Sequence, residues 1–209
     1  MKIIEPSVEI LSEINSDKIL KQIEIAARNC YKSEDKITTD STSAKKIIKM
    51  LLDNHHEAMI EFADIMVRLV CDIGVYKDLT RHRHCSFAIE STRYCSYNKD
   101  KFGNELNIIK PCNIHEGTSE YDLWYNCMLN IEQTYMKMAG LGCKPDQLRM
   151  LLPHSTAGSV VMKANIREWR HILKLRTSNA AHPSVQQLMK RILLIFKERI
   201  PVLFDDIII

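Results

Sequence analysis

Apolar side chains recur every three to four residues over much of this chain, which is the spacing of amphipathic helices. The pattern predicts long helices over 16–31, 42–52, 119–139, 165–175 and 184–199, and short helices over 75–81 and 145–152. Ser16 is of a type that begins helices, and Gly140 and Gly142 suit the end of the helix over 119–139. Helices therefore predominate in the predicted structure.

Two stretches show a pattern typical of strands. Ile65, Val67 and Leu69 alternate with more polar neighbours over 63–73, and residues 155–163 are small and β-branched. A short apolar run over 106–109 is a third candidate. Because neither an internal repeat nor a linker rich in Pro, Gly or Ser is present, we expect one α+β domain over 1–209, mostly helical with a small central sheet.

The composition excludes several classes of protein. The net charge of +3 is too small to indicate a nucleic-acid partner. No apolar stretch approaches the ~20 residues of a membrane-spanning helix, and residues 1–6 lack the features of a signal peptide, so a cytoplasmic protein without a membrane partner is expected. The seven cysteines include no Cys-x-x-Cys pair, which predicts reduced thiols and no metal site. Cys30, Cys71 and Cys127 are predicted to fill the core.

A dense group of cationic and hydroxyl side chains lies between Arg81 and Tyr94. It holds three arginines, two histidines, one carboxylate and three Ser or Thr hydroxyls. Guanidinium groups bind phosphate in a forked geometry, so a phosphorylated small molecule or nucleotide fits this set. A solvated charged loop is the commoner explanation of such a run. Phe87, Ala88 and Ile89 interrupt the charges, however, and this predicts that part of the run is buried in a loop at a functional edge.

The order of the motifs resembles one enzyme family. Arg81-His82-Arg83, seven residues and then Ser91 reproduce the Arg-His-Arg-x7-Ser motif of flavin-dependent thymidylate synthases. Three further blocks resemble that family in the expected order: 27–33, then 56–62 with His56-Glu57 and Glu61, and finally 165–182 with Asn165-x-Arg167 and Leu175-Arg176. The resemblance therefore extends over most of the chain.

The resemblance implies a homotetramer with shared active sites that converts dUMP to dTMP. In such an enzyme methylenetetrahydrofolate supplies the carbon, and FAD reduced by NADPH carries the hydride. By analogy, the flavin-binding residues are Arg81, His82, Arg83, His84, Asn165, Arg167 and His171. The residues that bind the nucleotide are Asp78, Glu90, Ser91, Thr92, Arg93, Arg149 and Arg176, with Arg93 on the phosphate.

Arg176 is also assigned the catalytic role. Uracil C5 must become nucleophilic, so negative charge develops on the pyrimidine edge, and a fixed cation there stabilises it. A helix-end cation that satisfies carbonyl groups is the alternative interpretation of Arg176. Ser91 is interpreted as a binding residue rather than a nucleophile, because no Ser-His-acid arrangement is evident. Cys85 and Cys95 are interpreted as structural thiols.

The chain also departs from the family pattern. Where the family often has Ser-x-Asn-Glu-x-Ser, this chain has Ala88 in place of the Asn, and its carboxylate, Glu90, lies one residue later. Ala58 stands where a hydroxyl is common. These changes indicate a divergent branch of the family rather than an inactive enzyme, since every arginine is retained. They are also the only support for an alternative function, a flavin- or nucleotide-binding protein of the same fold without synthase activity. A nucleic-acid-binding domain is a second alternative, which would require a larger charge excess.

Overall fold

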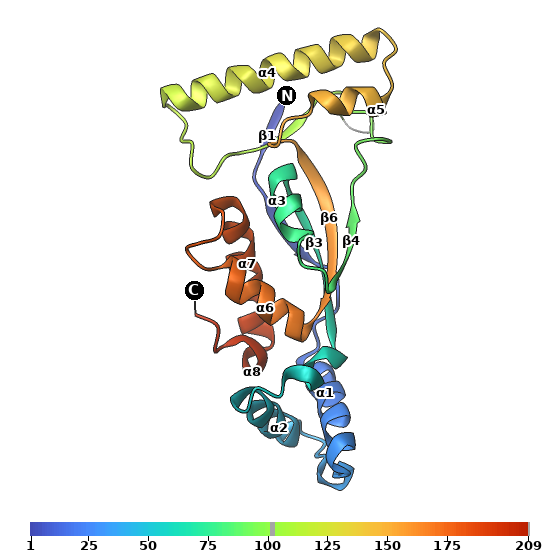
Figure 1. Cartoon of the computed structure of the whole chain (residues 1–209), viewed down its shortest axis with the longest axis vertical. Coiled ribbons are helices and arrows are strands. Elements are labelled where there is room, and N and C mark those ends of the chain that lie inside the picture. Colours follow the sequence, from blue (N-terminus) through green and yellow to red (C-terminus); the bar gives the residue numbers. More distant parts are fainter. Residues whose placement is uncertain (101–102, 209) are drawn as a thin grey trace. The chain divides into compact units, whose positions relative to one another are not determined.

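A computed structural model describes residues 1–100 and 103–208 of the chain (Figure 1). Its helices are α1 (Ser16–Tyr31), α2 (Thr42–Asp53), α3 (Ile73–Leu79), α4 (Ser119–Gly140), α5 (Pro145–Leu148), α6 (Ile166–Arg176), α7 (Pro183–Arg199) and α8 (Pro201–Phe204), with 3-10 turns η1 (Glu34–Lys36), η2 (Glu57–Phe62) and η4 (Arg149–Leu151). The predicted helices are confirmed with ends that differ by one or two residues in most cases.

The strands form two sheets. They are β1 (Lys2–Ile4), β2 (Ser7–Ile10), β3 (Asp64–Asp72), β4 (Cys85–Ile89), β5 (Asn107–Ile109) and β6 (Ala157–Asn165). β1 pairs in parallel with β5, with Ile3 opposite Ile108, and the larger sheet has the order β2-β3-β6-β4. The predicted α+β class is confirmed, although β1, β2 and β4 were not predicted as strands. These strands are too short to show a clear alternation.

The described residues divide into two compact units. The first unit comprises residues 1–7, 68–81 and 87–161, and the second comprises residues 8–67, 82–86 and 162–209 as far as they are described. Each unit is assembled from segments far apart in the sequence, so neither boundary coincides with a linker. The single domain over 1–209 remains a prediction. Within the described residues, no helix is both long and apolar enough to cross a bilayer.

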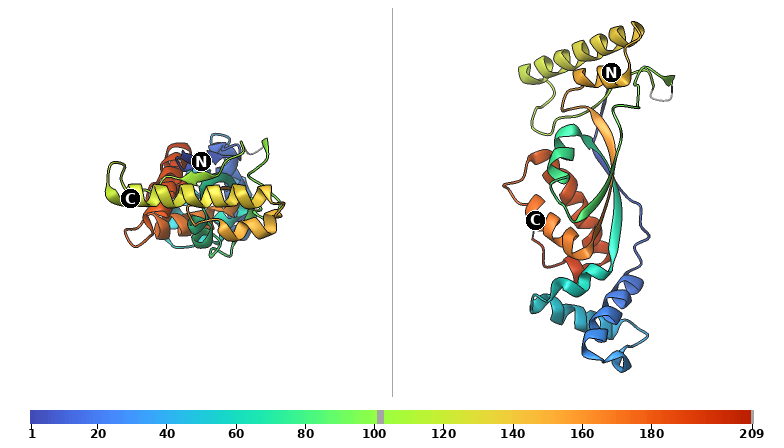
Figure 2. Two further views of the ribbon diagram at one scale, coloured as in Figure 1. Left: turned by 90° about the horizontal axis from the view of Figure 1, so that it is seen from above. Right: turned by 45° about the vertical axis from the view of Figure 1, so that its right-hand side comes forward.

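Each unit has its own apolar core. In the first, α4 lies beside α5 in both views of Figure 2, and buried Met128 and Tyr135 of α4 cluster with Leu148. In the second, the rings of Trp169 and Phe196 meet edge to face with centroids 5.4 Å apart. The indole N–H of Trp169 also donates to the Ile65 carbonyl at 3.0 Å, which ties α6 to β3.

Two predictions of burial were wrong. Cys71 is buried, but Cys30 and Cys127 are exposed. Cys30 lies in the last turn of α1, beyond the buried part of that helix, and Cys127 lies beside the buried face of α4 rather than on it. Part of the basic run is buried as predicted, at His82, whereas Ala88 and Ile89 are exposed because β4 is the edge strand of its sheet rather than a loop.

Candidate active site

The predicted site residues fall into two groups, one in each unit. The second unit holds His82, His84, Asn165, Arg167, His171 and Arg176. The first unit holds Asp78, Arg81, Glu90, Ser91, Thr92, Arg93 and Arg149. Arg83 belongs to the second unit and is exposed.

His82 is the buried residue of the basic run and contacts α6. The Nε–H of Arg176 donates to His82 Nε2 at 3.0 Å, and Glu168 Oε1 lies 3.6 Å from His82 Nδ1. The rings of His82 and His171 meet edge to face with centroids 5.9 Å apart. The first motif and the last block of the sequence therefore contact each other within one chain.

A cavity of about 540 Å³ opens beside this cluster in the second unit. Arg167 and Lys174 give it positive charge, and the imidazole rings of His84 and His171 line it beside them. The helical residues among them are spaced as i, i+4 and i+7, which places them on one face of α6. Asn165 begins this helix by accepting the N–H of Glu168 at 2.8 Å, so the positive end of the helix dipole also faces this region.

Carboxylates counter part of this charge. Arg167 Nη1 lies 2.6 Å from Glu61 Oε1, and Arg167 Nε lies 3.9 Å from Glu57. The 56–62 and 165–182 blocks of the sequence motif therefore contact each other through an ion pair. Because Arg167 is half-exposed and the two carboxylates contact its Nε and Nη1 atoms, the N–H groups of Nη2 remain for an anion.

Arg170 is the buried cation of the same cavity. Its guanidinium makes a bidentate ion pair with Asp206, at 2.6 and 2.7 Å, and a hydrogen bond to the Leu203 carbonyl. Its Nε is buried and has no hydrogen-bond partner among the described residues. A cavity lined by such an unsatisfied donor fits an anionic or hydrogen-bond-accepting ligand.

The thiol of Cys85 is unsuited to nucleophilic chemistry. Burial, with a smaller contribution from the Glu168 charge, raises the pKa of Cys85 to about 12. At neutral pH it is therefore a thiol rather than a thiolate. This agrees with its interpretation as a structural residue.

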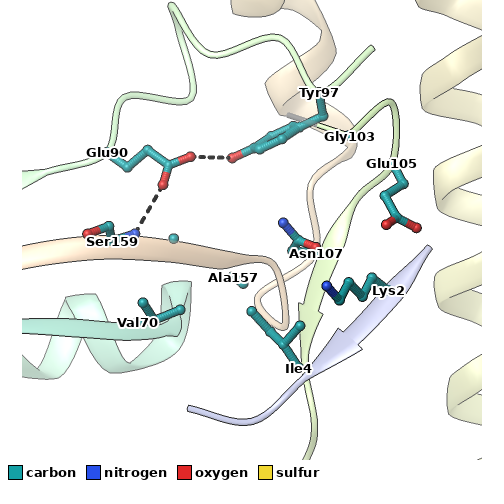
Figure 3. Close-up of a pocket in the computed structure, with 11 residues that line it drawn as sticks. Lys2, Ile4, Val70, Glu90, Tyr97, Gly103, Glu105, Asn107, Ala157 and Ser159 are labelled. Atoms are coloured by element: carbon teal, nitrogen blue, oxygen red, sulfur yellow. Dashed lines mark hydrogen bonds between the residues drawn. The ribbon is translucent and has the colours of Figure 1, made fainter. Parts of the chain in front are cut away.

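In the first unit, Glu90 lies at a second cavity, of about 330 Å³ (Figure 3). Its two carboxylate oxygens accept hydrogen bonds from the Tyr97 hydroxyl at 3.3 Å and from the Ser159 N–H at 3.1 Å. Burial, followed by the Glu90 charge, raises the pKa of the Tyr97 hydroxyl, so Tyr97 remains a donor. The nucleotide contact expected of Glu90 stays a prediction.

The residues after Glu90 form a tight turn. The Ser91 carbonyl accepts from the N–H groups of Tyr94 and Cys95, and the Ser91 hydroxyl accepts from the N–H of Arg93 at 3.3 Å. Arg93 is exposed, with its guanidinium 5.4 Å from the centre of the Tyr94 ring. Arg149 is exposed in η4, and Asp78 is half-buried in α3. Arg93 and Arg149 therefore present their charges to solvent.

Some lining residues were not predicted from the sequence. Glu168 and Lys174 were not predicted to line the site. Lys174 lies seven residues after Arg167, and this spacing places both residues on one face of a helix, which is a signal present in the sequence. Arg170 and its partner Asp206 are 36 residues apart, and no sequence pattern links them. Tyr97 lies outside the motif and is identified only by its contact with Glu90.

Comparison with known proteins identifies the family to which the chain belongs. The family model described as thymidylate synthase complementing protein matches residues 12–202, so the chain belongs to that family. The flavin-dependent thymidylate synthase of Corynebacterium diphtheriae is 25% identical over 201 residues, covering 88% of this chain and 77% of the relative. The protein of the same name from Corynebacterium aurimucosum is 27% identical over 200 residues, covering 88% and 78%.

A solved structure shares the fold. The UMP/dUMP methylase PolB of Streptomyces cacaoi, bound with 5-Br dUMP, has a TM-score of 0.78 at 21% identity, covering 98% of this chain and 96% of PolB. A likeness at this identity establishes the fold. The resemblance inferred from the motifs is therefore confirmed, as are the α+β class and membership of a family of enzymes.

Proposed function

We propose that the chain is a flavin-dependent thymidylate synthase that reductively methylates dUMP to dTMP. Methylenetetrahydrofolate is the carbon donor, and FAD reduced by NADPH is the hydride carrier. The hydrogen bond between Arg176 and His82 carries this proposal, because it joins the two motif blocks across 94 residues of sequence. The names of the curated relatives and the dUMP analogue bound by PolB support the same reaction.

The second-unit cavity suits the flavin. Arg167, His171 and the unsatisfied Nε of Arg170 would bind its anionic and acceptor groups, together with Asn165 at the start of α6. His84 lines the same cavity, and Arg81, His82 and Arg83 complete the proposed flavin-binding set. The bound flavin supplies the hydride chemistry, whereas the protein supplies binding, orientation and electrostatics.

The first-unit turn suits the nucleotide. Exposed Arg93 would bind the phosphate, with the Ser91 and Thr92 hydroxyls and Arg149 as further donors and Asp78 among the contacts. Arg176 would stabilise the negative charge that develops on the pyrimidine edge as C5 becomes nucleophilic. Because His82 accepts the Arg176 Nε–H, the guanidinium is fixed in direction.

A homotetramer with shared active sites is part of the same proposal, as is a cytoplasmic location. Large apolar side chains are exposed in each unit, for example Leu123 of α4 (74%) and Leu194 of α7 (57%). Burial against other copies of the chain would remove this apolar surface from water. Sedimentation of the purified protein tests the oligomeric state.

Two measurements test the function itself. The absorbance spectrum of the purified protein, before and after addition of FAD, tests flavin binding. An assay with labelled dUMP, in which methylenetetrahydrofolate, NADPH and FAD are omitted in turn, tests the reaction. A protein that binds flavin and forms no dTMP would support the alternative, a binding protein of the same fold. A colourless protein that takes up no FAD would contradict the proposed function.

A further inference from the structure

Glu90 and Tyr97 flank the segment that carries the proposed phosphate ligands. This segment, residues 91–96, contains the Ser91 hydroxyl and the Arg93 guanidinium. The Tyr97 hydroxyl, just after the segment, donates a hydrogen bond to Oε1 of Glu90, just before it, at 3.3 Å (Figure 3). A loop whose two ends are joined by a side-chain hydrogen bond has fewer accessible conformations than the same loop without that bond.

The other carboxylate oxygen fixes the first end of the segment to β6. Glu90 Oε2 accepts the N–H of Ser159 at 3.1 Å, and the N–H of Glu90 donates to the Ser159 carbonyl at 2.8 Å. Main chain and side chain of one residue therefore contact the same point of a nine-residue strand. This double contact fixes the direction in which the chain leaves β4.

Tyr97 fixes the other end of the segment to α4. It is 4% exposed and packs among the apolar core residues of the first unit. Its N–H donates to the hydroxyl of Tyr135 at 3.4 Å, and Tyr135 is itself buried in α4. The hydroxyl that reaches Glu90 is thus attached to a rigid element.

The position of the carboxylate follows from the departure in the sequence. Side chains alternate between the two faces of a strand, so a shift by one residue moves a side chain to the opposite face. Ile89 ends β4 and is 40% exposed, and the next residue, Glu90, extends the pairing with β6. The carboxylate at 90 therefore meets protein donors on both oxygens.

We propose that Glu90 is a positioning residue that closes the 91–96 loop and holds Ser91 and Arg93 where the nucleotide phosphate binds. It acts through these residues and makes no contact with the nucleotide itself. A carboxylate close to a phosphate would also repel it, which favours this role over direct contact. The inference rests on the proposed function only for the identity of the ligand that Ser91 and Arg93 bind.

Three variants separate positioning from direct participation. Glu90→Ala removes both side-chain hydrogen bonds. Glu90→Gln keeps them, because its carbonyl accepts from Ser159 and its amide donates to the Tyr97 hydroxyl. We expect Glu90→Ala to raise KM for dUMP about tenfold with kcat within about threefold, and Glu90→Gln to stay within about threefold in both, with an unchanged pH profile.

Tyr97→Phe keeps the buried ring and removes one hydrogen bond, so an increase in KM of about threefold is expected. Tyr97→Phe still tests the positioning role if Glu90→Ala does not fold. Equal losses in Glu90→Gln and Glu90→Ala, or an altered pH profile in the Gln variant, would show direct participation and overturn the proposal. Unchanged kinetics in both Glu90→Ala and Tyr97→Phe would overturn it as well.

A measurement without substrate distinguishes this inference from the proposed function. Amide hydrogen exchange over residues 91–97 should be faster in Glu90→Ala and Tyr97→Phe than in wild type, and close to wild type in Glu90→Gln. If the wild type neither binds dUMP nor forms dTMP, the proposed function fails, yet this exchange pattern still tests the positioning role. Equal exchange in all four proteins would contradict it.

Discussion

The Nε–H of Arg176, in the last turn of α6, donates to Nε2 of His82 at 3.0 Å. This contact requires His82 to be neutral with its proton on Nδ1, the nitrogen that lies 3.6 Å from Glu168. Arg176 is therefore held by a side chain of the basic run. A cation held in this way needs little reorganisation as substrate charge develops.

Replacing Arg176 with alanine should remove most dTMP formation. Because the expected role concerns charge that develops during the reaction, we expect kcat to fall about a hundredfold or more, with flavin still bound. Steady-state assays and the flavin absorbance of the purified variant measure the two properties separately.

The matched control is Arg199→Ala, which removes an exposed arginine near the end of α7. Its kcat should equal that of the wild type. Wild-type turnover in Arg176→Ala would contradict the catalytic role, and loss of flavin in that variant would indicate a structural one.

Arg93→Ala should mainly weaken substrate binding. The guanidinium is exposed at the turn that Ser91 begins, where a charge-assisted contact to phosphate would act on the ground state and the transition state alike. We expect KM for dUMP to rise about tenfold or more with a smaller change in kcat. Lys99→Ala, an exposed cation beyond the turn, is the control. An unchanged KM for Arg93→Ala would argue against the phosphate role.

Much of the fold could be predicted because helical periodicity is a local property. The apolar spacing within 119–139 and 184–199 is enough to predict α4 and α7. β1 and β2, of three and four residues, are recognisable only once their partners are known. The motif blocks indicated that His82 and Arg176 belong to one site, whereas the pairing of Arg170 with Asp206 depends on tertiary structure and has no local pattern.

Gly158 should be intolerant of a side chain. A Cβ at this position would lie 1.8 Å from the Tyr76 hydroxyl oxygen and 3.0 Å from the ring carbon that bears it, and Tyr76 is buried. We expect Gly158→Ala to lower the free energy of unfolding by about 1–3 kcal/mol in urea titrations. Gly140→Ala is the control, since nothing lies within 4 Å of its added carbon.

Tyr76→Phe should relieve part of this clash. The Tyr76 hydroxyl is buried and has no hydrogen-bond partner among the described residues, so its removal alone should change stability by no more than about 0.5 kcal/mol. The double variant should be more stable than Gly158→Ala. Simple additivity of the two changes would show that the clash is relieved by backbone movement instead.

The ion pair between Arg170 and Asp206 predicts a pH-dependent stability. The hydrogen bonds from Arg170 lower the pKa of Asp206 below its ordinary value. A carboxyl group with a lowered folded pKa stabilises the protein above its unfolded pKa of about 4, and this contribution is lost as the pH falls through the folded value.

Asp206→Asn should therefore lower the free energy of unfolding at neutral pH, and should lower it less at acid pH. Asp206 is half-exposed, so we expect a loss of about 1–2 kcal/mol rather than the larger cost of breaking a fully buried pair. Unfolding at pH 7 and below pH 4 measures the difference. Asp205→Asn, an exposed neighbour, should have little effect at either pH. A pH-independent difference for Asp206→Asn would contradict the ion-pair explanation.

The proposal of shared active sites predicts complementation between two inactive variants. Arg93 lies in the first unit and Arg176 in the second. If one active site takes these residues from different subunits, mixed oligomers of Arg93→Ala and Arg176→Ala contain some sites in which both arginines are intact. Random mixing of equal amounts would restore roughly a quarter of the sites. If both residues of a site come from one subunit, every site keeps one defect and mixing restores nothing.

Activity after co-refolding, compared with the activity of each variant refolded alone, separates the two arrangements. An activity equal to the mean of the two variants would contradict sharing between these residues.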